Sequence, residues 1–132
     1  MRSPATILAI VIMLLAGLCS AAGAAGQREE RCAIAAEGPG LKAKITHLTG
    51  RAPFYQVYDI NGTPIEVIEN IYLSQEFNIG PQAAALLGDK QVTLLVGGMA
   101  GPKMADVLDE NDIRFVFRKG MVEDVVKELK EE

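Results

Sequence analysis

Two glycine-proline pairs each begin a segment of small and apolar residues, and helix starts of this kind can bind anions. Gly80-Pro81 opens "GPQAAALLGDK" and Gly101-Pro102 opens "GPKMADVLDEN". Proline fits the first helical turn because its missing N–H has no intrahelical partner there. The free N–H groups and partial positive charge of a helix N-terminus favour a negatively charged ligand. Such pairs also start helices that bind nothing, so each pair alone leaves both interpretations open.

A third loop holds residues that could bind a metal or an anion. The stretch "ITHLTGRAPFY" contains His47, the only histidine of the chain, followed by Gly50 and Arg51. Imidazole is a common metal ligand, and a guanidinium group binds carboxylate or phosphate in a fork. A single histidine is more often an incidental surface residue. A lone cysteine such as Cys32 is most often a small buried apolar residue.

The elements that must position these loops are predicted from apolar patterns and turn residues. Strands are expected at Cys32–Glu37, Phe54–Ile60, Thr63–Asn70, Val92–Gly98 and Ile113–Phe117, and helices at Pro81–Asp89, Pro102–Asn111 and Val122–Leu129. Asn61-Gly62 predicts a tight hairpin between the second and third strands, because both positions tolerate positive φ.

The order β-β-β-α-β-α-β-α predicts an α/β fold with a mixed five-stranded sheet and helices on its faces. Three strands form a meander, and two helical crossovers place the later strands parallel in the same sheet. Both glycine-proline loops then lie at the carboxyl edge of the sheet, where ligands usually bind in open α/β folds. The repetition predicts a shallow pocket lined by backbone.

The first residues predict export. Residues 1–24 contain the basic Arg2, an apolar run from Ala5 to Leu18 and an Ala-x-Ala end at Ala22–Ala24, an order typical of a secretory signal peptide. The run is shorter than the roughly 20 residues that span a bilayer. We expect a signal peptide at 1–24, a polar leader at 25–30 and one domain at 31–132, in the periplasm or outside the cell. Membrane attachment would require an uncleaved signal.

The charge balance argues against nucleic acid as a partner. The chain has 13 basic and 17 acidic residues and a formal net charge of −4. Cleavage of the signal would remove Arg2 and make the balance more negative. Binding to phosphate backbones depends on a basic patch, so we expect no nucleic-acid partner.

Three strings in a fixed order carry a resemblance to a known family. They are Gly50-Arg51-Ala52 before the second strand, Gly80-Pro81-Gln82-Ala83 at the first helix and Gly98-Met99-Ala100-Gly101-Pro102 at the second. Over roughly residues 31–129 the sequence resembles the dinitrogenase iron–molybdenum cofactor-binding domain family. The resemblance implies a ribonuclease H-like fold and non-enzymatic binding or carriage of an iron–sulfur or iron–molybdenum type cluster. It also implies a partner protein that donates or accepts the cluster.

The resemblance further implies binding residues around the three loops. The expected cofactor-binding residues are Gly50, Arg51, Gly80, Gln82, Gly98, Met99 and Gly101, with His47 and Cys32 as the candidate metal ligands. Soft clusters prefer thiolate or imidazole, and loss of the signal with Cys19 would leave one of each. A four-ligand site of the structural zinc type therefore cannot be assembled from these residues.

Other interpretations stay open. The same loops could form a metal-independent module that binds a small anion. A ribonuclease H-like nuclease would need several carboxylates converging on a divalent metal; Glu37, Asp59 and Glu66 are the candidates, although polar strand ends explain them equally well. Finally, the aromatic strands could form the edge of a homodimer.

Overall fold

The computed structural model describes residues 29–131; the predicted signal peptide and the leader residues 25–28 lie outside the described residues. Its elements are β1 (Arg31–Ala36), the 3-10 turn η1 (Thr49–Arg51), β2 (Phe54–Asp59), β3 (Pro64–Glu69), α2 (Ile79–Asp89), β4 (Leu94–Gly97), α3 (Pro102–Glu110), β5 (Arg114–Phe117) and α4 (Val122–Lys130). Within this described range, no helix is both long enough and apolar enough to cross a membrane.

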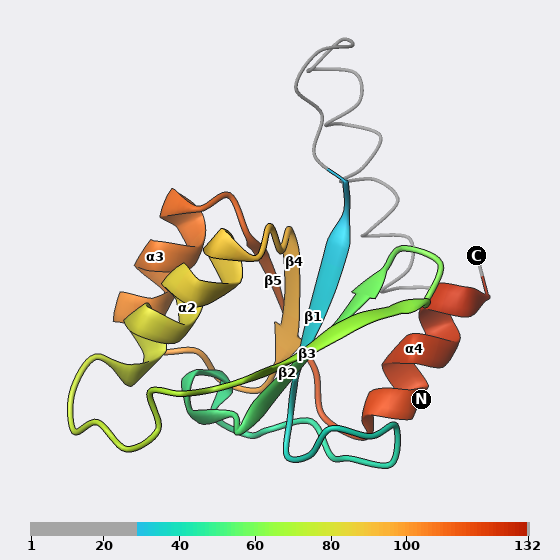
Figure 1. Cartoon of the computed structure of the whole chain (residues 1–132), viewed down its shortest axis with the longest axis horizontal. Helices are drawn as coiled ribbons and strands as arrows, with labels where there is room; N and C mark the ends of the chain where they lie inside the picture. Colours follow the sequence, from blue (N-terminus) through green and yellow to red (C-terminus); the bar gives the residue numbers. More distant parts are fainter. Residues whose placement is uncertain (1–28, 132) are drawn as a thin grey trace, which may run out of the picture.

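The five strands confirm the predicted mixed sheet. Their order is β3-β2-β1-β4-β5. Strand β2 is antiparallel to both β1 and β3, whereas β4 is parallel to β1 and β5 is parallel to β4. Because β1, β3, β4 and β5 run the same way, the loops that follow them all leave at one edge of the sheet (Figure 1).

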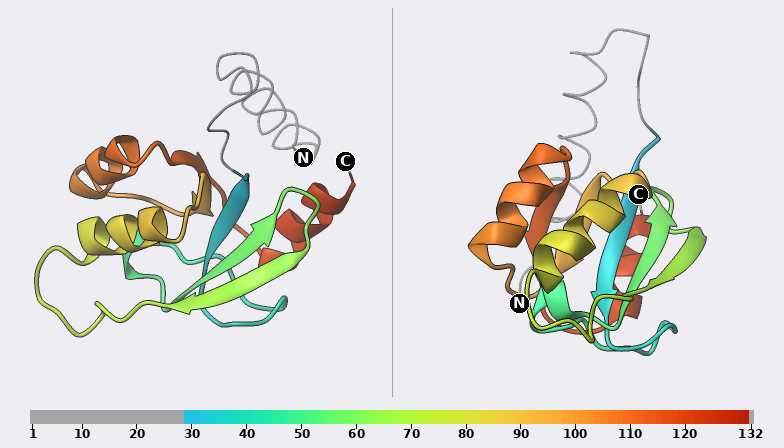
Figure 2. Two further views of the ribbon diagram at one scale, coloured as in Figure 1. Left: turned by 45° about the horizontal axis from the view of Figure 1, so that its top comes forward. Right: turned by 60° about the vertical axis from the view of Figure 1, so that its left-hand side comes forward.

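Helices cover both faces of the sheet and divide the core into two clusters. Helices α2 and α3 lie on one face and α4 lies on the other (Figures 1 and 2). Alternate residues of β1 serve the two clusters: Ala33 packs with Leu87 and Leu108, whereas Ile34 packs with Val122 and its neighbours. This alternation follows from the two-residue period of a strand and explains why β1 is apolar on both sides.

The β2–β3 hairpin forms where it was predicted, but its turn differs. Gly62 has φ +84°, whereas Asn61 does not have a positive φ. The Gly62 N–H donates to the carbonyl of Asp59 at 3.0 Å. The Asp59 carboxylate accepts the N–H groups of Asn61 and Thr63 at 2.8 and 3.0 Å. The Asp59 side chain therefore organises a longer loop with a single left-handed glycine, in place of a two-residue turn.

Most element boundaries differ from the predicted ones by one or two residues. The difference that matters for the site is the start of α2, which begins at Ile79 rather than Pro81. Pro81 is then the third helical residue, where a missing N–H still costs nothing because the first four N–H groups have no intrahelical partner. Asn78, just before the helix, has left-handed φ and ψ of 61° and 28°.

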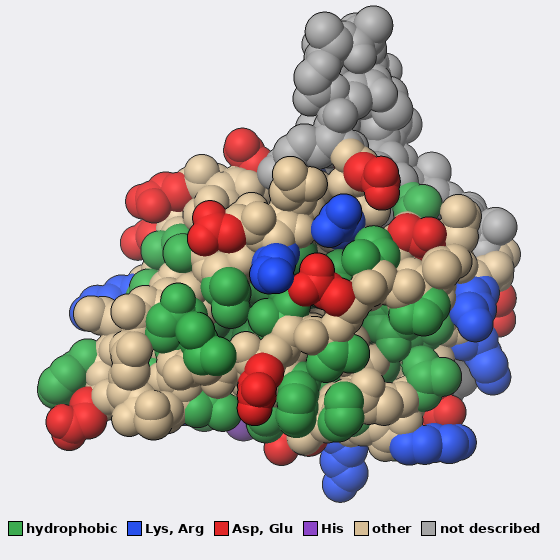
Figure 3. All heavy atoms as spheres, viewed as in Figure 1, with side chains coloured by type: hydrophobic (Ala, Val, Ile, Leu, Met, Phe, Trp, Pro, Cys, Tyr) green, Lys and Arg blue, Asp and Glu red, His purple; other side chains and the backbone are tan. Residues whose placement is uncertain are grey.

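The surface carries charges of both signs. On the face in Figure 3, acidic and basic side chains are interspersed rather than gathered by sign. Exposed ion pairs join Lys42 to Glu123 at 3.2 Å and Lys90 to Glu66 at 3.4 Å. Exposed pairs of this kind add little to stability.

Candidate functional site

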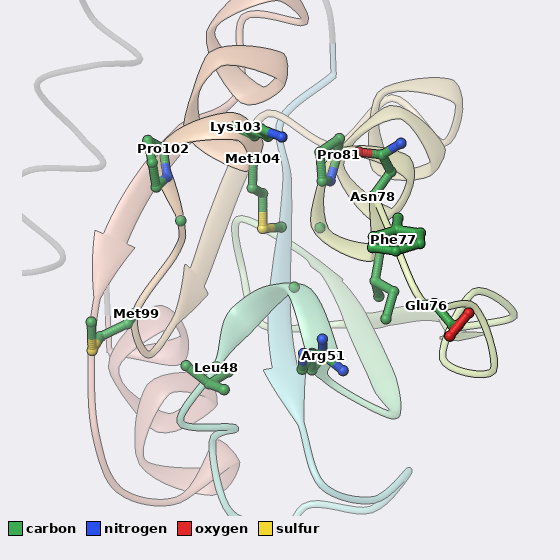
Figure 4. Close-up of a pocket in the computed structure, with 14 residues that line it drawn as sticks. Leu48, Arg51, Glu76, Phe77, Asn78, Pro81, Met99, Pro102, Lys103 and Met104 are labelled. Atoms are coloured by element: carbon green, nitrogen blue, oxygen red, sulfur yellow. The ribbon is translucent and has the colours of Figure 1, made fainter.

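A pocket of about 470 Å³ lies at the edge of the sheet where the loops after β1, β3 and β4 meet (Figure 4). Its walls are η1, the start of α2 with the residues before it, and the β4–α3 loop with the first turn of α3. The lining residues are Leu48, Gly50, Arg51, Glu76, Phe77, Asn78, Ile79, Gly80, Pro81, Met99, Gly101, Pro102, Lys103 and Met104. Both glycine-proline helix starts therefore line one pocket, as the sequence predicted.

The two helix starts offer backbone donors to this pocket. Neither Asn78, which precedes α2, nor Gly101, which precedes α3, forms a side-chain capping hydrogen bond. The first intrahelical acceptors, the carbonyls of Asn78 and Gly101, bond to the N–H groups of Gln82 and Ala105. The N–H groups before Gln82 in α2 and before Ala105 in α3 thus have neither an intrahelical partner nor a side-chain cap. With the two helix dipoles, they favour an anion between the helix starts.

The charged side chains of the pocket add to this preference. Arg51 from η1 and Lys103 from α3 contribute two positive charges, and Glu76 contributes one negative charge. In Figure 4, Arg51 and Lys103 lie on opposite sides of the pocket, with Met104 between them. The lining is therefore locally positive in a chain whose formal net charge is −4.

Close packing of two glycines forms the floor of the pocket. A Cβ added at Gly50 would lie 2.8 Å from the Cα of Gly80 and 3.3 Å from the Met104 sulfur. A Cβ at Gly80 would lie 3.2 Å from the Cβ of Met104, which is only 2 % exposed. The absence of side chains at both glycines thus brings η1 directly against α2. Gly101 differs, because a Cβ there would meet no atom of residues 29–131 within 4 Å.

A short backbone ladder joins η1 to the β4–α3 loop. The Gly98 N–H donates to Thr46 O at 3.0 Å, the Met99 N–H donates to His47 O at 2.7 Å, and the Thr49 N–H donates to Met99 O at 2.8 Å. A Cβ at Gly98 would lie 2.0 Å from His47 O. Gly98 therefore lets the β4–α3 loop lie directly against the backbone of His47, and it does not itself line the pocket.

The structure brings together most, but not all, of the predicted binding residues. Gly50, Arg51, Gly80, Met99 and Gly101 line the pocket. Gln82 is half-buried in the first part of α2, outside the lining, and its buried Oε1 has no hydrogen-bond partner in the described part of the chain.

The two predicted metal ligands lie elsewhere. His47 is exposed and is not part of the lining, whereas its neighbour Leu48 is. Leu48 has extended backbone angles (φ −107°, ψ 104°), and consecutive residues of an extended segment face opposite sides. Cys32 is buried in the cluster beneath α4. Burial raises its pKa to about 12, so it carries a neutral thiol and not a thiolate at neutral pH.

Several lining residues were missed in the sequence. Lys103 directly follows Pro102, and Glu76 and Phe77 come from the loop before α2. Phe77 is 76 % exposed, and an aromatic residue within the polar string "SQEFNIG" was the available signal. Within residues 29–131 no group of three or more His, Cys, Asp or Glu is placed to hold a metal ion.

Together, the fold and the pocket define a small α/β binding domain with an anion-compatible site at the carboxyl edge of its sheet. A family model described as dinitrogenase iron-molybdenum cofactor matches residues 30–132, and the protein belongs to this family. A comparison with curated proteins found no match.

Solved structures share this fold. The apo form of the orange protein from Desulfovibrio gigas is 27 % identical with a TM-score of 0.71, covering 77 % of this chain and 88 % of that one. A NifB-like protein from Thermotoga, of the DUF35 family, is 24 % identical with a TM-score of 0.64, over 76 % and 87 % of the two chains. The protein PH0822 is 22 % identical with a TM-score of 0.62, over 74 % and 86 %. The last two likenesses concern the fold alone.

Proposed function

We propose that this protein is a non-enzymatic binding or carrier domain that holds an iron–sulfur-type metallocluster, or a related anionic metal cofactor, in this pocket. The observation that carries the proposal is the convergence of two uncapped helix starts with Arg51 and Lys103 around one cavity. Membership of a family named for the iron–molybdenum cofactor supplies the class of cargo.

The donor set determines how such a cargo would be held. The described lining contains no thiolate and no imidazole; its only soft atoms are the thioethers of Met99 and Met104. The pocket therefore suits a cluster whose metals already carry their own ligands and whose negative charge is met by N–H groups and cations. Cys32, buried beneath α4, takes no part in this binding mode, and His47 enters the experiment below as a variant.

The proposal also includes a ribonuclease H-like fold, an exported location and a partner protein. The strand order β3-β2-β1-β4-β5, with β2 alone antiparallel, supports a ribonuclease H-like fold. The signal-like residues 1–24 support an exported form, in the periplasm or outside the cell. A carrier also needs a protein that donates or accepts the cluster, and that protein would contact the mouth of the pocket.

The experiment is to purify the full chain anaerobically from cells that make iron–sulfur clusters. Bound iron and molybdenum are then measured together with the visible absorption spectrum. We expect stoichiometric metal, and we expect Arg51→Ala to reduce the affinity about tenfold or more, because it removes a charged donor. His47→Ala should leave the metal content unchanged.

Two glycine variants give a matched comparison. A Cβ added at Gly101 or at Gly40 meets nothing within 4 Å among the described residues, but of these two glycines only Gly101 lines the pocket. Gly101→Ala should therefore reduce metal binding without loss of stability, and Gly40→Ala should change neither. A colourless protein that cannot be reconstituted with metal would refute the carrier proposal.

The second candidate function is a metal-independent module for a small anion, favoured by the same absence of thiolate and imidazole from the lining. It predicts that a simple oxyanion such as phosphate or molybdate raises Tm in the metal-free protein. It also predicts that Gly101→Ala removes this effect and that Gly40→Ala preserves it.

A further inference from the structure

Asn70 is a buried polar residue at the point where the chain leaves β3 for the loop before α2. It is only 4 % exposed, although it carries an amide side chain. A buried amide normally needs partners for its donors and its acceptor. In this protein those partners all belong to two segments next to the pocket.

The first of these segments is the η1 turn. The Asn70 Nδ2 group donates to the carbonyl of Ala52 at 3.0 Å and to that of Gly50 at 3.3 Å. The backbone N–H of Asn70 donates to Pro53 O at 3.0 Å. The Asn70 side chain thus bonds to the carbonyls of Gly50 and Ala52, which flank Arg51. The Asn70 backbone bonds to Pro53, the residue after Ala52.

The second segment is the loop that forms the far wall. The Asn70 Oδ1 atom accepts the N–H of Tyr72 at 3.1 Å. This bond sets the direction in which the chain leaves β3, and the same loop ends at Glu76, Phe77 and Asn78 in the pocket lining. One side chain therefore connects two walls of the pocket.

Arg51 itself depends on this support. Arg51 is exposed, and in the described part of the chain its guanidinium forms no ion pair and no side-chain hydrogen bond. Only the backbone of η1 directs it towards the pocket: the Arg51 N–H donates to Leu48 O at 2.9 Å and the Ala52 N–H to Thr49 O at 3.3 Å. Fixing the carbonyls of Gly50 and Ala52 fixes the base from which this side chain extends.

We propose that Asn70 is the positioning residue of the pocket: it holds Arg51 in place for an anionic ligand. The proposal rests on the proposed function for the ligand, but its structural half can be tested without one. Asn70 is not among the lining residues of the pocket, so it acts through Arg51 and the loop that it anchors.

The first test uses ligand-free protein and amide hydrogen exchange. Asn70→Ala removes the donors to Gly50 and Ala52, and Asn70→Asp removes them while keeping the side-chain volume. Exchange at the Arg51 and Ala52 amides should accelerate about tenfold or more in both variants, the scale expected from losing buried hydrogen bonds. The acceleration at Arg51 and Ala52 should exceed that at the amides of α4, on the other face of the sheet, which report any change in global stability.

Asn111→Ala is the matched control. Asn111 is a half-buried asparagine whose Nδ2 donates to Val107 O at 2.9 Å at the end of α3, away from the pocket. Its replacement should leave exchange at Arg51 unchanged. Unchanged exchange at Arg51 in both Asn70 variants would overturn the proposal, whatever the protein binds.

The second test is a double-mutant cycle with tetrathiomolybdate, a sulfide-rich anion, as the probe. Asn70→Ala should weaken its binding about fivefold or more when Arg51 is present and clearly less when Arg51 is already alanine, where only the loop before α2 still depends on Asn70. Equal losses in both backgrounds would refute action through Arg51. If the wild-type protein fails to bind the probe, the proposed function is in doubt, and the exchange experiment still decides the role of Asn70.

Discussion

The Thr49 hydroxyl donates a hydrogen bond of 3.0 Å to the carbonyl oxygen of Gly98, joining two pocket walls that are 49 residues apart in the sequence. Thr49 is fully buried. Its own carbonyl accepts the hydroxyl of Tyr55 at 2.6 Å, and burial raises the pKa of that phenol, which stays protonated. The pocket is thus held by buried polar side chains in its loops as well as by the helices that open into it.

We predict that Thr49→Val destabilises the protein more than Thr49→Ser. Valine keeps the shape of threonine but leaves the Gly98 carbonyl without its donor in a buried position, which should cost about 1–3 kcal/mol. Serine keeps the hydroxyl and loses one methyl group, worth about 0.8 kcal/mol. Urea unfolding measures both free energies. A serine variant less stable than the valine variant would show that packing, and not the hydrogen bond, matters here.

Gly50 and Gly101 should respond differently to alanine although both line the pocket. At Gly50 a methyl group would meet the backbone of Gly80 at 2.8 Å, and overpacking of this kind costs about 1–3 kcal/mol. Gly101 has open space and ordinary backbone angles (φ −72°, ψ 163°), so alanine there should be neutral or stabilising by up to about 1 kcal/mol. Thermal or urea unfolding of the two variants distinguishes the outcomes, and similar losses at both positions would contradict the packing described here.

The Arg118–Glu128 ion pair provides a test away from the pocket. The Arg118 Nη1 donates to Glu128 Oε1 at 2.9 Å, a second hydrogen bond joins the same two groups, and the Glu128 side chain is 4 % exposed. The hydrogen bond to Glu128 raises the pKa of Arg118, so the guanidinium stays charged. Arg118→Ala would leave a buried carboxylate without its partner and should lower the free energy of unfolding by about 3–5 kcal/mol.

The control for this prediction is the double variant Arg118→Met with Glu128→Leu. It removes both charges and should be much more stable than Arg118→Ala, because no buried charge is left unpaired. Equal instability of the single and double variants in urea unfolding would show that the packing of α4, rather than the charge, sets the cost.

Most of the fold could be predicted from the sequence, because the patterns that indicate its strands and helices are local. The apolar runs and the Gly-Pro helix starts gave the order of strands and helices, and chain direction alone placed both helix starts at one sheet edge. The turn at Asp59 was misjudged because Asn61-Gly62 gave the stronger pattern, whereas the side chain of Asp59 determines the loop.

The candidate site could be predicted only in part, because orientation and long-range bonds leave no local pattern. The position of His47 outside the lining depends on the direction of a single extended residue, and the burial of Cys32 beneath α4 depends on which face of β1 it occupies. The roles of Thr49 and Asn70 arise from bonds to residues far along the chain or across a loop. No spacing rule in the sequence announces such bonds.

The last prediction concerns pH and the thiol of Cys32. Burial raises its pKa from the usual 9.0 to about 12. Between these values the unfolded chain loses the thiol proton and the folded protein keeps it, so the folded state binds more protons and becomes less stable as pH rises. The stabilising effect is fully present below pH 9.0 and is lost towards the folded pKa, with a slope of at most about 1.4 kcal/mol per pH unit.

Urea unfolding from about pH 8 to about pH 10 tests this on the wild type and on Cys32→Ala. The variant should be less stable at the lower pH, because it loses buried volume, but its stability should fall less steeply as the pH rises. Burial also raises the pKa values of Tyr55 and Tyr58 above the usual 10.0, so both proteins lose some stability near pH 10, and the difference between their slopes reports on Cys32. Parallel pH profiles for the two proteins would mean that Cys32 is not buried in the folded state, and its thiol would then react rapidly with an alkylating reagent near neutral pH.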